Sequence, residues 1–296
     1  METGIPAPTS NNQMHFIGGI LSLASLLMAT VASAPSTRFP RAVEYSRPGG
    51  VPLYFDAAIP PGPGPFSAVV IVHGGGWVRG DRRADVLPLF RPLEDAGIAW
   101  FSIDYRLLRN ISEFNAPIED VRNAVVYIRD HAAEYRIDPD RIALIGESAG
   151  GQLAAMAALN PKPSGNVSGV VAFYAPTNLA ELAKNSDLIP NELRASLNGT
   201  PFEALLLNGL RQLSPVDKVA PGAPPFLLIH GTQDGLVPFA QSQAMCARLK
   251  AAGASCELMP IPGGGHGIRW WESALPQEAK EYKAEMVRWL RRVLNA

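Results

Sequence analysis

Short apolar runs alternate with segments of helical periodicity along most of the chain. Six runs have the length and composition of buried strands: 68–72, 98–103, 141–145, 167–173, 225–229 and 256–259. Between two of them, residues 117–135 carry Ile118, Val121 and Val125 at spacings of three and four, which is typical of a helix with one buried face. Strands that alternate with helices predict a mostly parallel sheet covered by helices on both faces. Functional residues of such sheets lie where the strands end.

The two ends of the predicted domain have patterns of their own. Residues 53–58 alternate apolar and polar positions between Pro- and Gly-rich turns, which predicts an exposed edge strand in a first hairpin. Val287, Leu290 and Val293 form one stripe near the carboxyl end and predict a last helix.

One interval, 175–222, interrupts the alternation of strands and helices. It offers helical pieces at 178–184, 191–197 and 202–213, separated by prolines and glycines. We predict a small helical insertion or lid over the site here.

The first 34 residues differ from the rest of the chain. Residues 16–34 contain no charge and end in Ala32-Ser33-Ala34, a small-residue pattern typical of signal-peptide cleavage. No Lys or Arg precedes this run, its length approaches that of a membrane span, and translation from Met14 would shorten it. We expect a secreted or periplasmic domain at 35–296, with an N-terminal membrane anchor or a cytoplasmic chain as the alternatives.

Composition excludes several classes of protein. Hydrophobic residues make up 47% and charged residues 18% of the chain, which is typical of a globular protein and not of a disordered one. The net charge of -1 argues against nucleic-acid binding. The two cysteines, Cys246 and Cys256, are too few for a disulfide scaffold or a zinc site. They fall in a predicted helix and at the start of the strand after it, so a disulfide and two free thiols are both open.

A candidate nucleophile follows the predicted strand 141–145. The motif is Gly146-Glu147-Ser148-Ala149-Gly150-Gly151, and a small-residue helix to Leu159 comes next. A sharp turn from strand to helix exposes a serine hydroxyl, and the helix amino terminus favours the negative charge that develops on its oxygen. This context predicts Ser148 as a nucleophile.

A glycine-rich loop follows the predicted strand 68–72, with the sequence His73-Gly74-Gly75-Gly76-Trp77. Such a loop can direct backbone N–H groups at one point, and we assign Gly75 and Gly76, with Ala149, to an oxyanion hole. A phosphate-binding loop is a weaker interpretation, because no Lys-Ser or Lys-Thr follows. We interpret His73 as structural and place Trp77 and Glu147 in a substrate pocket.

A serine nucleophile needs a general base and an acid that orients it. His266 lies in a glycine-rich loop after the last predicted strand, while His230 closes a strand and suits a structural role. Asp234 follows the penultimate strand, and we prefer it to Asp217 and Glu257 as the acid. The predicted catalytic triad is therefore Ser148, Asp234 and His266.

From about Phe55 onward the chain resembles the esterase and lipase branch of the α/β-hydrolases, particularly its hormone-sensitive-lipase-like and carbohydrate-esterase-like groups. The resemblance rests on the two glycine motifs, on Asp104-Tyr105-Arg106 and on Ile118-Glu119-Asp120. It implies the α/β-hydrolase fold and structural roles for Asp104 and Arg106. Where hormone-sensitive-lipase relatives continue with Ala-Pro-Glu, this chain has Leu108-Arg109-Asn110, which favours the smaller group of exported feruloyl and acetylxylan esterases.

These features predict a serine carboxylesterase that cleaves short-chain acyl esters or acetyl and feruloyl groups on carbohydrate, through an acyl-enzyme. The substrate would be a small molecule or attached to a polysaccharide, and no metal, organic cofactor or protein partner is implied. A formamidase-like amide hydrolase would share every predicted site residue, and a non-catalytic ligand-binding relative is the second alternative.

Overall fold

The structure is a computed structural model that describes residues 37–38, 42–110, 113–185 and 199–296. The predicted leader at 1–34 and the predicted helical piece at 191–197 lie outside the described residues. No helix in the described ranges has the length and hydropathy needed to cross a bilayer.

A single mixed sheet forms the centre of the described domain. Its strands are β1 (Thr37–Arg38), β2 (Val43–Ser46), β3 (Leu53–Ile59), β4 (Phe66–Val72), β5 (Ala99–Ile103), β6 (Ile137–Glu147), β7 (Val170–Phe173), β8 (Phe226–Gly231) and β9 (Cys256–Ile261). They are ordered β1-β3-β5-β4-β6-β7-β8-β9, and β2 also pairs with β3. Strands β4 to β9 are parallel, whereas β1, β2 and β3 pair antiparallel. The loops after β4 to β9 therefore share one edge of the sheet.

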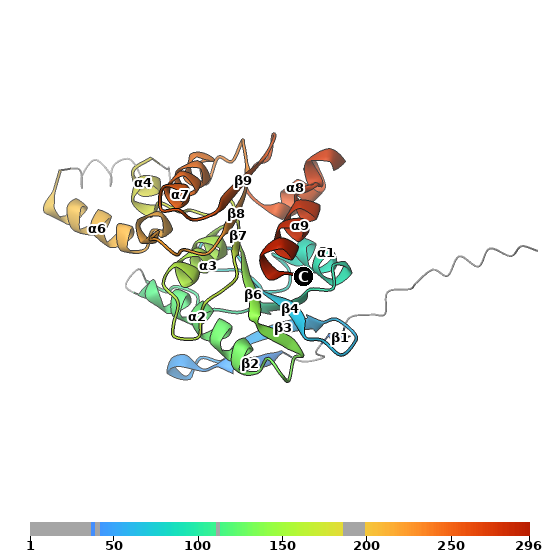
Figure 1. Cartoon of the computed structure of the whole chain (residues 1–296). Helices are drawn as coiled ribbons and strands as arrows, with labels where there is room; N and C mark the ends of the chain where they lie inside the picture. Colours follow the sequence, from blue (N-terminus) through green and yellow to red (C-terminus); the bar gives the residue numbers. More distant parts are fainter. Residues whose placement is uncertain (1–36, 39–41, 111–112, 186–198) are drawn as a thin grey trace, which may run out of the picture. The chain divides into compact units, whose positions relative to one another are not determined.

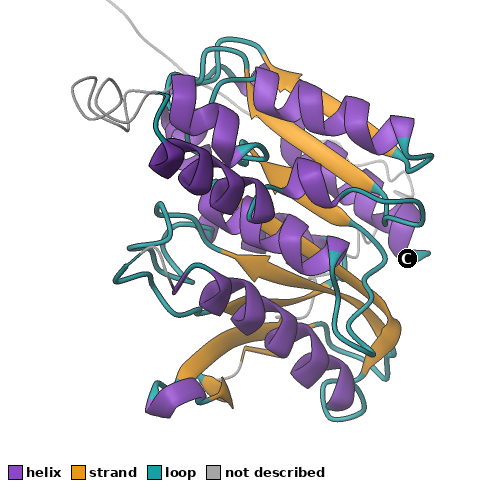
Figure 2. Cartoon of the chain, turned by 90° about the vertical axis from the view of Figure 1, so that its left-hand side faces the viewer, coloured by secondary structure: helices purple, strands orange, loops and turns teal. Residues whose placement is uncertain are grey.

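Helices cover both faces of this sheet (Figure 1). They are α1 (Leu87–Asp95), α2 (Asn115–Asp130), α3 (Ala149–Leu159), α4 (Leu179–Asn185), α6 (Pro201–Gln212), α7 (Ala240–Ala251), α8 (Ile268–Ala274) and α9 (Tyr282–Leu294). Helices α1, α8 and α9 bury their apolar side chains in one core, and α2, α3 and α7 bury theirs in the other. Figure 2 shows helices lying across the twisted strands. The arrangement is the α/β-hydrolase fold.

All six predicted strands are present, and the apolar runs of β4, β5, β7 and β8 suit strands that are covered on both faces. Strand β9 was predicted as buried, but it is the last strand of the sheet, and Glu257 is exposed. Two other expectations also need correction. The helix predicted to reach residue 135 ends at Asp130, because His131 departs from helical geometry with a φ of -103° and a ψ of 20°. Residues 131–136 then form turns before β6 begins. The predicted edge strand is not at an edge: β3 lies between β5 and the pair β1 and β2, and five of its seven residues are buried.

The insertion predicted at 175–222 contains α4 and α6 and the short 3₁₀ turn Pro215–Lys218. Helix α6 extends away from the sheet in Figure 1. A covering role over the site stays a prediction.

A disulfide joins Cys246 of α7 to Cys256 at the start of β9. Of the two alternatives left open by the sequence, the structure therefore has the bridge.

Candidate active site

Ser148 occupies the turn between β6 and α3 and has a φ of 52° and a ψ of -121°. Strained backbone of this kind costs about 1–3 kcal/mol and persists only where the surroundings enforce it. The flanking glycines are part of that enforcement, because a Cβ on Gly146 would lie 2.2 Å from the Gly150 carbonyl oxygen. A Cβ on Gly150 would in turn lie 2.2 Å from the carbonyl oxygen of Val72 in β4. The turn can therefore pack against the sheet only with glycine at both positions.

The structure brings Ser148, His266 and Asp234 together. The His266 Nε2 atom lies 2.8 Å from the Ser148 Oγ atom. On the other side of the ring, Nδ1 lies 2.7 Å from Oδ2 of Asp234. These side chains are separated by 118 and 32 residues in sequence and meet because β6, β8 and β9 end at the same edge. A proton can move along this line from the serine hydroxyl to the imidazole.

The carboxyl group of Asp234 is buried, and its side chain has no exposed surface. Burial alone would raise the pKa of Asp234, but hydrogen bonds from His230 and His266 and the charge of His266 outweigh burial and lower that pKa. The N–H groups of Leu236 and Val237 also donate to Oδ1, each at 2.9 Å. Asp234 is thus held as a carboxylate that faces His266.

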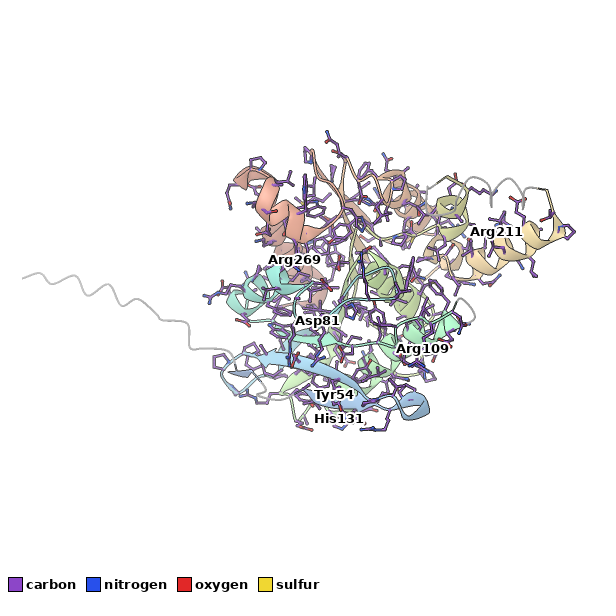
Figure 3. All side chains as sticks on the ribbon, turned by 180° about the vertical axis from the view of Figure 1, so that it is seen from behind. Tyr54, Asp81, Arg109, His131, Arg211 and Arg269 are labelled. Atoms are coloured by element: carbon purple, nitrogen blue, oxygen red, sulfur yellow. A yellow bond between two sulfur atoms is a disulfide. The ribbon has the colours of Figure 1, made fainter. Side chains whose placement is uncertain are left out.

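The other described histidines have structural surroundings. His73 is buried, its Nδ1 lies 2.8 Å from the Gly74 carbonyl oxygen, and burial lowers its pKa. His131 directly follows α2, with its Nδ1 atom 2.7 Å from the Tyr127 carbonyl oxygen. Figure 3 shows His131 near the lower edge of the domain, well below Arg269 of α8. His230 contacts the Asp234 loop through the Val237 carbonyl oxygen.

The two rejected carboxyl candidates lie elsewhere. Asp217 belongs to the 3₁₀ turn Pro215–Lys218, and Glu257, on β9, accepts a hydrogen bond from Arg292 at 2.6 Å.

The glycine-rich loop after β4 has a backbone that requires glycine. Gly75 and Gly76 have φ values of +106° and +62°, and a Cβ on Gly75 would lie 2.2 Å from the Arg79 carbonyl oxygen. The Gly74 N–H is already used, since it donates to Oε1 of Glu147 at 2.7 Å. Ala149 is the first residue of α3, so its N–H has no acceptor within the helix. The N–H groups of Gly75, Gly76 and Ala149 are therefore the candidates to hold an oxyanion.

Glu147 does not line a substrate pocket, and this prediction is wrong. Its side chain is buried, with Oε1 accepting from Gly74 and Oε2 accepting from the Tyr174 hydroxyl at 2.8 Å. Burial raises the pKa of the Glu147 carboxyl, while these two hydrogen bonds oppose the rise. The physical reason for the error is that β6 ends at Glu147, whose side chain points beneath the glycine-rich loop, whereas Ser148 occupies the sharp turn that follows.

Tyr174 is a site residue that the sequence analysis missed. It follows β7, is fully buried, and accepts a hydrogen bond from the Ile268 N–H at 2.8 Å. Its ring makes an edge contact with the imidazole of His266, at 4.6 Å between centroids. Tyr174 and Glu147 thus connect the oxyanion loop to the His266 loop. A tyrosine directly after a strand at the catalytic edge was the only signal available.

Trp77 is half-buried beside the same loop. Its indole N–H donates to Oε1 of Gln152 at 3.0 Å, and its ring packs against Phe114 at 5.0 Å. These contacts fix the ring, and its place in a substrate pocket stays a prediction. Its carbonyl oxygen accepts the Leu108 N–H at 2.8 Å, which ties the oxyanion loop to the loop after β5.

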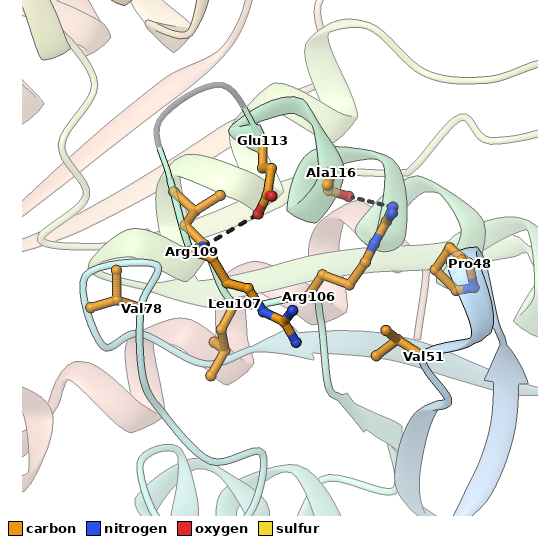
Figure 4. Close-up of a pocket in the computed structure, with 10 residues that line it drawn as sticks. Pro48, Val51, Val78, Arg106, Leu107, Arg109, Glu113 and Ala116 are labelled. Atoms are coloured by element: carbon orange, nitrogen blue, oxygen red, sulfur yellow. Dashed lines mark hydrogen bonds between the residues drawn. The ribbon is translucent and has the colours of Figure 1, made fainter.

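An open hollow of about 590 Å³ lies on the outer side of this junction (Figure 4). Val51, Val78 and Leu107 supply exposed apolar surface to it. Arg106, at its wall, is held by hydrogen bonds to the carboxylate of Asp120, in agreement with the structural role implied for it. Asp104 likewise pairs with Arg82 at 2.7 Å. Among the described residues, no group of three or more His, Cys, Asp or Glu side chains could hold a metal ion.

The BD-FAE family matches residues 56–249. Esterase LipC of Mycobacterium tuberculosis is 30% identical over 69% of this chain and 53% of its own length, and Esterase LipQ of the same organism is 31% identical over 70% and 51%. The chain thus spans about half the length of the curated relatives it matches.

Solved structures of similar proteins cover more of the fold. A thermophilic esterase of Thermogutta terrifontis, Est2, solved with butyrate bound, has a TM-score of 0.69 at 26% identity and covers 83% of this chain and 92% of its own. A truncated carbohydrate esterase from gut microbiota has a TM-score of 0.70 at 26% identity, covering 90% and 99%.

Proposed function

The chain belongs to the BD-FAE family and has the α/β-hydrolase fold, and on this premise we propose that it is a serine carboxylesterase. The observation that carries the proposal is the continuous line from Ser148 through His266 to Asp234, with gaps of 2.8 and 2.7 Å. The esterases LipC and LipQ and the esterase structures support the reaction class.

Acyl transfer would begin when the Ser148 Oγ atom attacks the ester carbonyl carbon and His266 Nε2 takes the hydroxyl proton. The carbonyl oxygen becomes an oxyanion held by the N–H groups of Gly75, Gly76 and Ala149. Collapse of this intermediate breaks the carbon–oxygen bond of the ester, and His266 gives its proton to the departing alcohol. An acyl group remains covalently attached to Ser148.

Deacylation would repeat these steps with water as the nucleophile. His266 removes a proton from water, the resulting hydroxide attacks the acyl carbon, and the proton is returned to Ser148 as the acid leaves. Throughout, the Asp234 carboxylate holds the Nδ1–H and stabilises the imidazolium. One lost oxyanion donor would cost roughly 3 kcal/mol of transition-state stabilisation.

We further propose that the acyl group is short or is an acetyl or feruloyl group on carbohydrate. Est2 was solved with butyrate, and a carbohydrate esterase shares the fold at 26% identity. Export of the domain from the cytoplasm, by a cleaved signal or on an N-terminal anchor, fits a substrate carried by an external polysaccharide. No metal or organic cofactor takes part in the steps above.

The test is hydrolysis of p-nitrophenyl acetate, butyrate and octanoate and of a feruloyl ester by the purified protein, Ser148→Ala and a control, Ser255→Ala. Ser255 is exposed and lies directly before β9, so its substitution leaves the site intact. We expect kcat/KM to fall by at least about 10⁴-fold in Ser148→Ala and to stay unchanged in the control. Full activity in Ser148→Ala would refute the assignment. Faster cleavage of a matched formamide than of its ester would identify an amide hydrolase instead.

A further inference from the structure

The imidazole of His230 is fully buried at the end of β8, four residues before Asp234. Both of its ring nitrogens have polar neighbours. Nε2 lies 2.9 Å from the Val237 carbonyl oxygen, and Nδ1 lies 2.7 Å from the Ser242 Oγ atom of α7. The ring of Phe239 closes the remaining side with an edge contact at 5.7 Å. These three contacts hold the His230 ring in one orientation.

These neighbours determine where the proton of a neutral His230 ring resides. A carbonyl oxygen can only accept, so Nε2 must carry the hydrogen that Val237 receives. The Ser242 hydroxyl can donate, so it supplies the hydrogen to the bare Nδ1. Ser242 therefore selects the tautomer in which the N–H of His230 points toward the Asp234 loop.

That N–H acts on Asp234 in two ways. The Nε2 atom lies 3.4 Å from Oδ2 of Asp234, the same oxygen that faces His266. It also holds the carbonyl oxygen of Val237, whose N–H donates to the other Asp234 oxygen at 2.9 Å. His230 thus fixes both the loop backbone that binds Asp234 and the field at the oxygen that orients the base.

We propose that His230, held by Ser242, is a positioning residue for Asp234, so that the site is a line of five side chains: Ser242, His230, Asp234, His266 and Ser148. The proposal rests on the proposed function in that Asp234 orients His266 for catalysis. His230 does not touch the reacting atoms. Its effect reaches them through the carboxylate.

Removal of the His230 N–H should therefore affect kcat and leave substrate binding intact. In His230→Leu the carboxylate loses one of its polar neighbours and its loop loses the hydrogen bond at Val237. A misplaced orienting group weakens interactions made in the transition state, and we expect kcat to fall about 10- to 100-fold with KM nearly unchanged. His230→Gln restores an N–H at a similar reach and should recover most of the loss. His131→Gln, at a histidine outside the site, is the matched control.

Nuclear magnetic resonance of the full chain tests the proposal without any reference to activity. The ¹⁵N signals of His230 are assigned as those that disappear in His230→Gln. Their chemical shifts should show the neutral tautomer with hydrogen on Nε2. The Nδ1 proton shared by His266 and Asp234 should be protected from exchange in the wild type and in His230→Gln, and exchange rapidly in His230→Leu. Three titratable groups face His266, namely Asp234, Glu147 and Tyr174. All the variants retain these three residues.

The outcomes separate the two proposals. Hydrogen on Nδ1 of His230, or a His230→Leu protein with wild-type kcat and a protected His266 proton, would overturn the positioning role. The tautomer is measured on the wild type, so this test stands even if His230→Leu does not fold. A different outcome is that the wild type cleaves no ester, while the His266 proton is protected in the wild type and exchanges rapidly in His230→Leu. This result would refute the proposed function and support the positioning role.

Discussion

Removing one oxygen atom from the protein, in Tyr174→Phe, should destabilise the fold and do so more at alkaline than at acidic pH. The Tyr174 hydroxyl is buried, donates to Oε2 of Glu147 at 2.8 Å and accepts the Ile268 N–H at 2.8 Å. Phenylalanine fills the same volume, so the substitution removes two hydrogen bonds and leaves the packing almost unchanged.

The magnitude follows from the partners that remain. A buried polar group left without its partner costs about 1–3 kcal/mol, and here a carboxyl oxygen and a backbone N–H both lose one. We expect the free energy of unfolding to fall by about 2–5 kcal/mol, which corresponds to a Tm lower by roughly 5–15 °C for a domain of this size.

The pH dependence comes from Glu147. Burial raises the pKa of its carboxyl, and the hydrogen bond from Tyr174 opposes that rise. Without the hydroxyl, the pKa of Glu147 rises further. An acid whose pKa is raised by folding stabilises the fold fully below its ordinary pKa and loses that contribution as pH rises through the raised value. The difference in the free energy of unfolding between Tyr174→Phe and the wild type should therefore be larger at pH 8 than at pH 5.

Urea unfolding followed by tryptophan fluorescence at both pH values measures this difference. Tyr54→Phe is the control, because Tyr54 is half-buried on β3, away from the carboxylate, and should change stability by about 0.5 kcal/mol or less. A loss below about 1 kcal/mol in Tyr174→Phe, or the same loss at pH 5 and pH 8, would contradict the reasoning.

Three further predictions concern the loops around the site. Gly75→Ala places a Cβ 2.2 Å from a backbone carbonyl oxygen and should lower kcat/KM about 100-fold or more. In Gly76→Ala the added Cβ meets nothing within 4 Å, so this variant should lose only about 1–2 kcal/mol of stability. Equal kcat/KM values for the two variants would argue against the loop assignment. Replacing both Cys246 and Cys256 by serine opens a short loop and should lower the free energy of urea unfolding by about 3 kcal/mol, and an unchanged midpoint would show that the bridge is dispensable. Asp234→Asn should keep the fold by circular dichroism and reduce kcat about 10³- to 10⁴-fold, and a loss under tenfold would remove Asp234 from the triad.

Much of the fold could be predicted because its central strands are buried on both faces and form continuous apolar runs in the sequence, such as 68–72 and 225–229. The candidates Ser148, Asp234 and His266 followed from the same source, since each lies in the turn or loop that follows a predicted strand. Because β6, β8 and β9 are parallel, the loops that follow them lie at the same edge of the sheet.

Side-chain partners beyond those three could not be predicted in this way. Periodicity indicates which residues are buried but not what a buried polar group contacts, so Glu147 was placed in the pocket and Tyr174 was missed. For the same reason His230 could be recognised as structural, whereas its contact with Asp234 depends on a turn that only coordinates reveal. Strand β3 was misplaced because its alternation resembles that of an edge strand until β1 and β2 pair with it.

The parallel order of β6, β8 and β9 has a consequence for the moment at which this chain becomes reactive during its synthesis. Ser148 emerges from the ribosome 118 residues before His266, the general base of the proposed mechanism. Until β9 has emerged and joined the sheet, the exposed serine has no base and is an ordinary hydroxyl. By the proposed mechanism, a nascent chain, or one cut before β9, would therefore lack esterase activity, which would arise only after the parallel sheet is complete.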